Sequence, residues 1–251
     1  MRITLLYTLF FVFIVLIIIY SIYRMKNTVD IEDIYVINLD SSKKRLDEFT
    51  EKANAQNIPF KRWSAINGKE MTYADFRNVG APRWALQDLT KKRKGELGCY
   101  YSHFSLISEM SKKSVSSNKA VLIFEDDVRF PENFLHKLHE ALAEVPSDWD
   151  ILFLGHENSK FFTGQTGKVR KIKDFWGCHA YVVRKSSIPK FLPYLEFPSE
   201  PIDNILEDLG ARGYINNYAT VKPIAYPGTG VSDITDKMPA PEYREDAYPT
   251  K

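Results

Sequence analysis

Short apolar runs that alternate with amphipathic stretches constrain the fold of this chain more than any other feature. Runs rich in β-branched and aromatic residues lie at 34–39, 120–124 and 150–155. Their length is that of a buried strand. Residues 42–53 repeat apolar side chains at helical spacing on an otherwise charged stretch, as an amphipathic helix does. This alternation predicts an α/β domain in which helices cover a sheet.

Weaker patterns complete the predicted order of elements. In chain order they indicate a strand near 60–63, a short helix at 72–79, helices at 95–112 and 131–145, a strand at 178–183 and a helix at 186–195. The polar stretch 156–175 is expected to be a mobile loop. From residue 223 onward, frequent proline and glycine residues predict an extended or disordered tail.

The amino terminus carries a long apolar segment. No charged side chain occurs from Ile3 to Tyr23, and as a helix this stretch can cross a hydrocarbon core of roughly 30 Å. A cleaved signal peptide is the competing interpretation, but its apolar region is usually only about 7–15 residues long. The tyrosines at its end suit a membrane interface and favour an uncleaved anchor. The expected organisation of this single-pass membrane protein is an anchor at 1–23, a tether at 24–32, a folded domain at 33–222 and a tail at 223–251.

The charge balance and the cysteines exclude several classes of function. With 34 basic and 32 acidic side chains, the formal net charge is +2, so no bulk field attracts nucleic acid as a main partner. The two cysteines, Cys99 and Cys178, lack Cys-x-x-Cys spacing. This argues against a zinc site and against a disulfide-stapled scaffold, and predicts buried free thiols.

Three acidic residues, Glu125, Asp126 and Asp127, follow the apolar run 120–124 directly. Ligands of open α/β sheets bind beyond the carboxyl ends of the strands, where these carboxylates should lie. Strand periodicity would turn Glu125 and Asp127 to one side and Asp126 to the other. Mg²⁺ and Mn²⁺ are typically held by one or two carboxylates together with substrate phosphates. The cluster therefore indicates a site for a cation and a diphosphate.

A plainer interpretation of the same cluster is a solvated turn that also caps the next helix. An isolated Glu-Asp-Asp favours that interpretation, so the motif needs support from the rest of the chain.

Four motifs occur in a fixed order across residues 34–206, and together they resemble glycosyltransferase family 25, the lipopolysaccharide and procollagen galactosyltransferase group. The motifs are Ile37-Asn38-Leu39-Asp40 with Arg45 following, Gly95-Glu96-Leu97-Gly98-Cys99-Tyr100-Tyr101-Ser102-His103, Leu122-Ile123-Phe124-Glu125-Asp126-Asp127, and Pro201-Ile202-Asp203. The resemblance implies a GT-A-like nucleotide-diphospho-sugar transferase fold. The apolar segment described above adds one N-terminal transmembrane helix, in which this chain departs from the usual bacterial members of the family. The resemblance also implies an inverting mechanism, a Mn²⁺ or Mg²⁺ cofactor and a UDP-sugar donor, commonly UDP-galactose.

Site residues follow from the resemblance by position. Asn38, Asp40 and Arg45 match the first motif, where the nucleotide would lie. In the second motif, Gly98 would let another backbone approach closely, and Ser102 and His103 could reach phosphate or sugar hydroxyls. Taken alone, Arg45 could equally be an exposed helix charge and His103 a structural histidine.

The third and fourth motifs supply the metal site and the base. The resemblance makes Asp127 the first choice as a metal ligand, with Glu125 or Asp126 assisting through the ribose or water. Asp203 is the candidate general base for an acceptor hydroxyl. It could equally be an acidic residue favoured at a helix amino terminus. The acceptor would be a glycan, a lipopolysaccharide or a hydroxylated protein.

The tail matches the family only loosely, and it offers no histidine as a further metal ligand. Two other functions remain open. One is a different metal-dependent phosphoryl or nucleotidyl transferase, because paired acids beyond a strand serve phosphates generally. The other is a membrane-tethered carbohydrate-binding protein without turnover.

Overall fold

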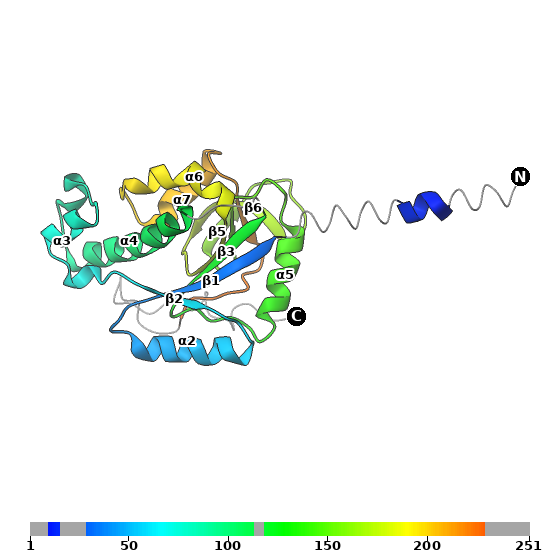
Figure 1. Ribbon diagram of the computed structural model, residues 1–251. Coiled ribbons are helices and arrows are strands. Elements are labelled where there is room, and N and C mark those ends of the chain that lie inside the picture. The colour runs from blue at the N-terminus through cyan, green and yellow to red at the C-terminus, as the bar shows by residue number, and fades with distance from the viewer. Residues whose placement is uncertain (1–9, 16–28, 113–117, 229–251) are drawn as a thin grey trace, which may run out of the picture.

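The computed structural model describes residues 10–15, 29–112 and 118–228. Within these ranges the chain alternates strands and helices as the sequence predicts (Figure 1). The elements are β1 (Asp30–Asn38), α2 (Lys43–Ala55), β2 (Lys61–Ser64), η1 (Gly68–Glu70), α3 (Tyr73–Asn78), η2 (Arg83–Leu86), α4 (Lys91–Ser111), β3 (Lys119–Glu125), α5 (Phe134–Glu144), β4 (Ile151–Phe153), β5 (Glu157–Phe161), β6 (Val169–Trp176), β7 (Ala180–Arg184), η3 (Lys185–Ser187), α6 (Ile188–Phe191), η4 (Leu192–Glu196), α7 (Ile202–Ala211) and β8 (Asn217–Thr220).

The strands of this part of the chain form one mixed sheet of eight, in the order β2-β1-β3-β7-β4-β8-β6-β5. β1 pairs in parallel with both β2 and β3. β7 runs antiparallel between β3 and β4, and β8 is parallel to β4. Because β1, β2 and β3 are parallel, their carboxyl ends lie together at one edge of the sheet.

Helices cover both faces of the sheet, which gives three layers (Figure 1). On β3, Val121 and Ile123 pack into a core with residues of α4, α6 and α7. Leu122 and Phe124 point the other way, into a core with residues of α2 and α5. This is the period-two alternation of a strand buried on both faces, and it confirms the predicted α/β layering.

The carboxyl-end edge is completed by α4, whose backbone lies against the loop that follows β2. A Cβ added at Gly98 would meet the amide nitrogen of Gly68 at 2.5 Å and the carbonyl oxygen of Ile66 at 2.7 Å. Ser102 Oγ fixes the same contact, because it accepts from the Ile66 amide at 2.8 Å and donates to the Gly98 carbonyl at 2.6 Å. The close approach expected at Gly98 thus positions the loop at 66–68.

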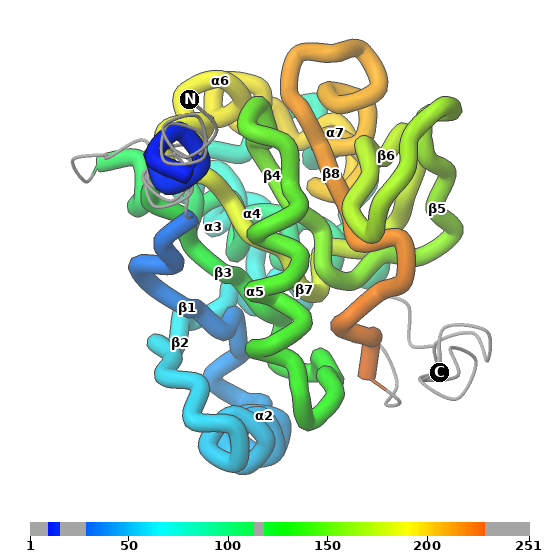
Figure 2. Tube along the Cα trace, turned by 90° about the vertical axis from the view of Figure 1, so that its right-hand side faces the viewer, coloured from blue at the N-terminus to red at the C-terminus, as the bar shows by residue number. Residues whose placement is uncertain are grey.

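The stretch 156–175 is not the loop that its composition predicts, because β5 and β6 pair there as an antiparallel hairpin. Figure 2 shows this hairpin beside β8. The buried residues of β6 are Val169, Ile172 and Phe175, three apart, and the β5–β6 register shifts. Such irregular strands lose the strict alternation that sequence patterns detect.

Other predicted boundaries also differ. The long helix begins at Lys91 rather than 95, because the Thr90 hydroxyl accepts from the Arg93 amide and caps it. The helix expected at 131–145 begins at Phe134. The helix expected at 186–195 is broken into η3, α6 and η4, since Pro189 and Pro193 each remove a backbone donor.

The folded part of the chain extends beyond residue 222, where the sequence predicts the domain to end. Ile224, Ala225 and Tyr226 are buried, and Tyr226 exchanges backbone hydrogen bonds of 2.7 and 2.8 Å with Arg129. Strand β8, which the sequence patterns missed, leads into this segment. It is only four residues long and reads Asn-Tyr-Ala-Thr, which gives no apolar signal.

The predicted anchor at 1–23 lies largely outside the described residues. Residues 10–15 are helical, and the side chains of Phe10, Phe11 and Phe13 are exposed. In the described parts of the chain, every helix is too short or too polar to cross a membrane.

His156, which immediately precedes β5, should make stability depend on pH. Its Nε2 lies 2.8 Å from the Thr220 carbonyl oxygen, and burial lowers its pKa from 6.5 to about 4. The unfolded chain therefore binds more protons than the folded chain between these pH values. Stability conferred by the neutral ring should be present above about pH 6.5 and lost as pH falls toward 4, by roughly 3 kcal/mol.

Urea unfolding from pH 4 to 8 measures this effect. His156→Gln should reduce the slope of the free energy of unfolding against pH between pH 4 and 6.5. His139→Gln is the matched control, because His139 is exposed on α5 and its replacement should keep the wild-type slope. An unchanged slope in His156→Gln would contradict the assignment.

Gly98→Ala should separate α4 from the loop at 66–68, because all three atoms that the added Cβ would meet are backbone atoms that cannot rotate away. We expect a loss of about 1–3 kcal/mol in the free energy of unfolding, as for other overpacked sites. Lys92→Ala, an exposed position on the same helix, should change stability by less than about 0.5 kcal/mol. Denaturant titration of the three proteins distinguishes the two effects.

Candidate functional site

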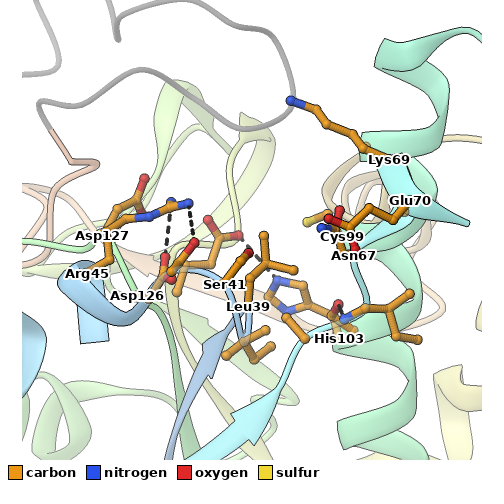
Figure 3. A pocket seen from close by; sticks show the side chains of 18 residues that line it. Leu39, Ser41, Arg45, Asn67, Lys69, Glu70, Cys99, His103, Asp126 and Asp127 are labelled. Carbon is orange, nitrogen blue, oxygen red and sulfur yellow. Dashed lines mark hydrogen bonds and ion pairs between the residues drawn. The ribbon is translucent and has the colours of Figure 1, made fainter. Parts of the chain in front are cut away.

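A pocket of about 290 Å³ opens at the carboxyl-end edge of β1 and β3. Figure 3 shows Arg45, Asp126 and Asp127 on one side of it, and Lys69, Glu70 and Cys99 on the other. The wall is built by the ends of β1 and β3, the start of α2, the loop and η1 after β2, and one face of α4. Its lining residues are Ile37, Leu39, Ser41, Ser42, Arg45, Ala65, Ile66, Asn67, Gly68, Lys69, Glu70, Gly95, Cys99, Ser102, His103, Glu125, Asp126 and Asp127.

Asp126 connects the end of β3 to the end of β1 and to α2. Its Oδ2 accepts from Asn38 Nδ2 at 2.6 Å, and its Oδ1 lies 3.2 Å from Arg45 NH1. Burial raises the pKa of Asp126, while Arg45 and Asn38 oppose that rise. Arg62 in turn donates to Asn38 Oδ1 at 2.8 Å, so the amide of Asn38 is held from both ends.

Glu125 lies on the opposite side of the strand end, toward α4. His103 Nε2 is 3.2 Å from Glu125 Oε1, and His103 Nδ1 is 2.8 Å from the hydroxyl of Tyr181. Burial opposes ionisation of Glu125, but the hydrogen bond and charge of His103 outweigh it and lower the pKa of Glu125. This carboxylate is therefore charged in the folded chain.

Positive charge near Asp127 does not offset the effect of burial on its pKa. Burial, followed by the charges of Glu125 and Asp126, raises its pKa to about 7. β3 ends at Glu125, so Asp127 lies in a turn and the strand alternation does not extend to it. The backbone of Gly228 packs against it, since a Cβ added there would meet the Asp127 carbonyl oxygen at 2.7 Å.

The pKa values of the three carboxylates thus differ, because their environments differ. A divalent cation at their edge would lower the pKa of Asp127 by direct attraction and relieve the repulsion among the three. Oxygen donors on one sheet edge are the ligand set that Mg²⁺ and Mn²⁺ prefer. The carboxylates are therefore of the ligand type that such an ion prefers.

Four predicted site residues do not line the pocket: Asn38, Asp40, Gly98 and Asp203. Asp40 is exposed and forms an ion pair with Arg62, and it accepts from Ser64 Oγ at 2.9 Å. Asp203, near the start of α7, accepts from the amide of Gly177 at 2.8 Å. The charge of Asp203 nevertheless acts on a residue of the pocket. Burial raises the pKa of Cys99, and the negative charges of Glu125 and Asp203 raise it further.

Other predicted residues act as supports. Asn38 is buried beneath Asp126, and Gly98 faces the loop at 66–68. Ser102 lines the pocket, but both hydrogen-bonding functions of its hydroxyl already serve the backbone.

Sequence reasoning missed Cys99 and the loop residues Asn67, Lys69 and Glu70 as lining residues. Cys99 precedes His103 by four residues, the spacing that places two side chains on one helix face, so this signal was present. The loop residues carried no such signal, because only the packing of the loop at 66–68 on α4 brings them to the pocket.

Comparison with known proteins agrees with the four motifs. The model of glycosyltransferase family 25 (LPS biosynthesis protein) matches residues 31–206. The human protein named inactive glycosyltransferase 25 family member 3 is 27% identical over 190 residues, covering 71% of this chain and 30% of that protein. Mouse procollagen galactosyltransferase 2 is 28% identical over 138 residues, covering 50% of this chain and 21% of that protein.

A viral protein is also similar. The procollagen lysyl hydroxylase and glycosyltransferase of Acanthamoeba polyphaga mimivirus is 26% identical over 207 residues, covering 76% of this chain and 23% of that protein. The matches thus span less than a third of the length of these relatives. The family match itself covers most of the chain and includes every strand of the carboxyl-end edge, so this chain belongs to glycosyltransferase family 25.

Proposed function

We propose that this chain is an inverting, metal-dependent glycosyltransferase with a GT-A-like fold. It would move a hexose from a UDP-sugar to an acceptor hydroxyl. The observation that carries the proposal is the group of three carboxylates beside Arg45 at the carboxyl-end edge of a family 25 sheet. Family membership favours sugar transfer over the nucleotidyl-transfer alternative.

The pocket suits the diphosphate of a nucleotide sugar. Arg45 lies at one side of the opening and Lys69 at the other, and the carboxylates lie at the base of the Arg45 side (Figure 3). Cationic side chains near the opening would attract the phosphate oxygens. Leu39 and Ile66 add apolar wall against which a base or ribose can pack.

Asp127 and Glu125 would hold Mn²⁺ or Mg²⁺, which when bound supplies positive charge to neutralise the departing diphosphate. The protein's own contribution is to keep this edge ordered. Asn38 and Arg45 hold Asp126, and His103 holds Glu125, so these two carboxylates keep their direction before a donor arrives.

Asp203 is our candidate for the general base. It would take the proton of the acceptor hydroxyl as that oxygen forms a bond to the anomeric carbon, while the bond from that carbon to the diphosphate breaks. Attack from the side opposite the leaving group inverts the configuration. The Gly177 amide holds the Asp203 carboxylate by one oxygen and leaves the other for the acceptor.

Galactose is the proposed hexose, because similar proteins are named procollagen galactosyltransferases. A glycan, a lipopolysaccharide or a hydroxylated protein would be the acceptor. Relatives named inactive favour one rival, a carbohydrate-binding protein without turnover. The presence of all three carboxylates and of Asp203 supports the enzyme instead.

Metal-dependent hydrolysis of a panel of UDP-sugars tests the donor site without knowledge of the acceptor. The chain with Mn²⁺ should hydrolyse UDP-galactose, and Asp127→Asn should lower that rate on the order of 100-fold by removing a ligand carboxylate. Asp208→Asn, an exposed acid on α7, is the matched control and should keep the wild-type rate. No hydrolysis of any UDP-sugar, with nucleotide binding unchanged in Asp127→Asn, would refute the metal site.

Asp203→Asn tests the base, since asparagine can still accept from the Gly177 amide. Transfer to a hydroxylated collagen peptide should fall by roughly 100-fold or more, while the dissociation constant for UDP stays within about twofold. A transfer rate equal to that of Asp208→Asn would remove Asp203 from the mechanism.

A further inference from the structure

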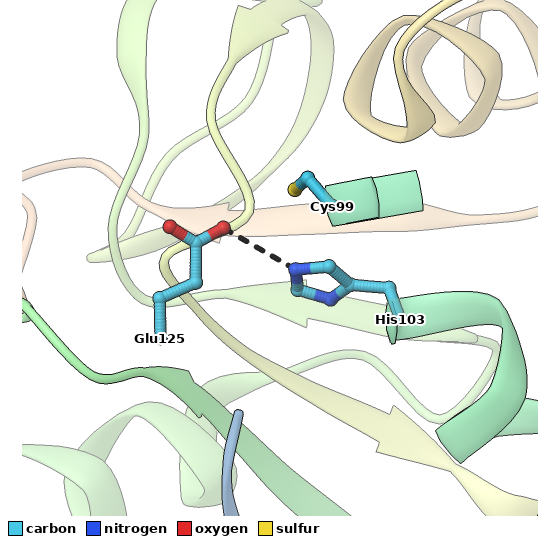
Figure 4. A group of neighbouring side chains, drawn as sticks. All are labelled: Cys99, His103 and Glu125. Atoms are coloured by element: carbon cyan, nitrogen blue, oxygen red, sulfur yellow. Dashed lines mark hydrogen bonds and ion pairs between the residues drawn. The ribbon is translucent and has the colours of Figure 1, made fainter. Parts of the chain in front are cut away.

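Cys99, His103 and Glu125 form a compact group of mixed metal ligands (Figure 4). Each offers one ligand atom, the sulfur, a ring nitrogen and a carboxylate oxygen, and all of these atoms lie within 4.8 Å of one another. Two independent elements deliver them, α4 and the end of β3. The helical spacing of four places Cys99 and His103 on one face, and the end of β3 brings Glu125 opposite that face.

This donor set differs from the oxygen donors at Asp126 and Asp127. Thiolate and imidazole select zinc and similar thiophilic ions, whereas Mg²⁺ and Mn²⁺ prefer carboxylates. We propose that Cys99, His103 and Glu125 bind one thiophilic divalent cation, with Zn²⁺ the best fit, at the α4 side of the pocket. The absence of Cys-x-x-Cys spacing, which speaks against zinc in the sequence, does not bear on a set of one cysteine, one histidine and one glutamate.

The surroundings of His103 support coordination through Nε2. Its other nitrogen, Nδ1, lies 2.8 Å from the hydroxyl of Tyr181. A metal-bound histidine typically has its second nitrogen held by a hydrogen bond that fixes the ring. His103 and Tyr181 are also stacked, with ring centroids 5.7 Å apart, so packing as well as the hydrogen bond favours this ring orientation.

Coordination requires a proton to leave. In the metal-free chain, burial and the Glu125 charge raise the pKa of the Cys99 thiol, so the sulfur is protonated. On binding, the S–H bond breaks, the proton passes to solvent and the sulfur donates its electron pair to the cation. Coordination through Nε2 uses the lone pair of that nitrogen, and the ring proton then lies on Nδ1, next to the Tyr181 hydroxyl. The thiol releases one proton for each ion bound, so affinity rises with pH.

Three protein ligands leave a fourth position of a tetrahedral ion, which would face the pocket and take water or a ligand oxygen. All three side chains line that pocket. Glu125 is shared with the proposed donor site, so an ion here would compete with Mn²⁺ for that carboxylate. The site itself rests on the three side chains and does not depend on sugar transfer.

Co²⁺ is the probe, because thiolate coordination produces a sulfur-to-cobalt charge-transfer absorption. The full chain in detergent should bind one Co²⁺ with this absorption, and stoichiometric Zn²⁺ should displace it. Cys99→Ser should abolish the absorption and weaken Zn²⁺ binding at least about 100-fold, measured by competition with a chromophoric chelator. Cys178→Ser is the matched control, since Cys178 is the other free cysteine and lies outside the group.

Glu125→Gln provides a second readout, in which the absorption persists while Zn²⁺ affinity falls. Circular dichroism checks that each variant is folded. The proposal is overturned if the wild-type chain binds no Co²⁺ through sulfur, if the absorption survives in Cys99→Ser, or if Cys178→Ser loses it equally. If the chain binds Zn²⁺ in this way but, freed of Zn²⁺ and supplied with Mn²⁺, neither hydrolyses a UDP-sugar nor loses nucleotide binding in Asp127→Asn, the cation site stands and the proposed donor site is refuted.

Discussion

The parallel pairing of β1 with β3 is the constraint on which the site depends. It sets Ile37 beside Glu125 in register, so the next residues, Asn38 and Asp126, meet across the strand ends and form a 2.6 Å hydrogen bond. α2 begins a few residues later and brings Arg45 to the same carboxylate. A one-residue slip would turn the buried side chains of β3 to the wrong faces. Burial of Ile123 and Phe124 therefore also fixes where the acids lie.

Like charges at this edge are tolerated because each has a different environment. His103 stabilises Glu125 as an anion. Burial opposes ionisation of Asp126, whereas the neighbouring Arg45 favours it. Burial and the charges of Glu125 and Asp126 disfavour ionisation of Asp127, and they raise its pKa to about 7. A bound cation would stabilise this cluster, since it would reduce the repulsion among the carboxylates and lower the free-energy cost of ionising Asp127.

α4 contributes a sulfur and an imidazole side chain to the pocket, in addition to the carboxylates of the sheet edge. Its tight contact with the loop at 66–68 brings Lys69 and Glu70 to the opening, and its inward face carries Cys99 and His103. Glu125 is the one side chain that belongs to both sides. The pocket thus offers oxygen ligands toward α2 and sulfur and nitrogen ligands toward α4, and this difference would let two kinds of cation compete for one carboxylate.

The sequence by itself determined the layered α/β class, the central strands and the family, because long apolar runs and ordered motifs are local signals. The acidic cluster at the end of β3 was predictable for the same reason. Only the tertiary structure decided that Asp40 pairs with Arg62 outside the pocket and that Cys99 joins His103 and Glu125. It also decided that 156–175 forms a hairpin and that Gly228 packs on Asp127. These outcomes depend on contacts between residues far apart in the chain, which periodicity and composition do not encode.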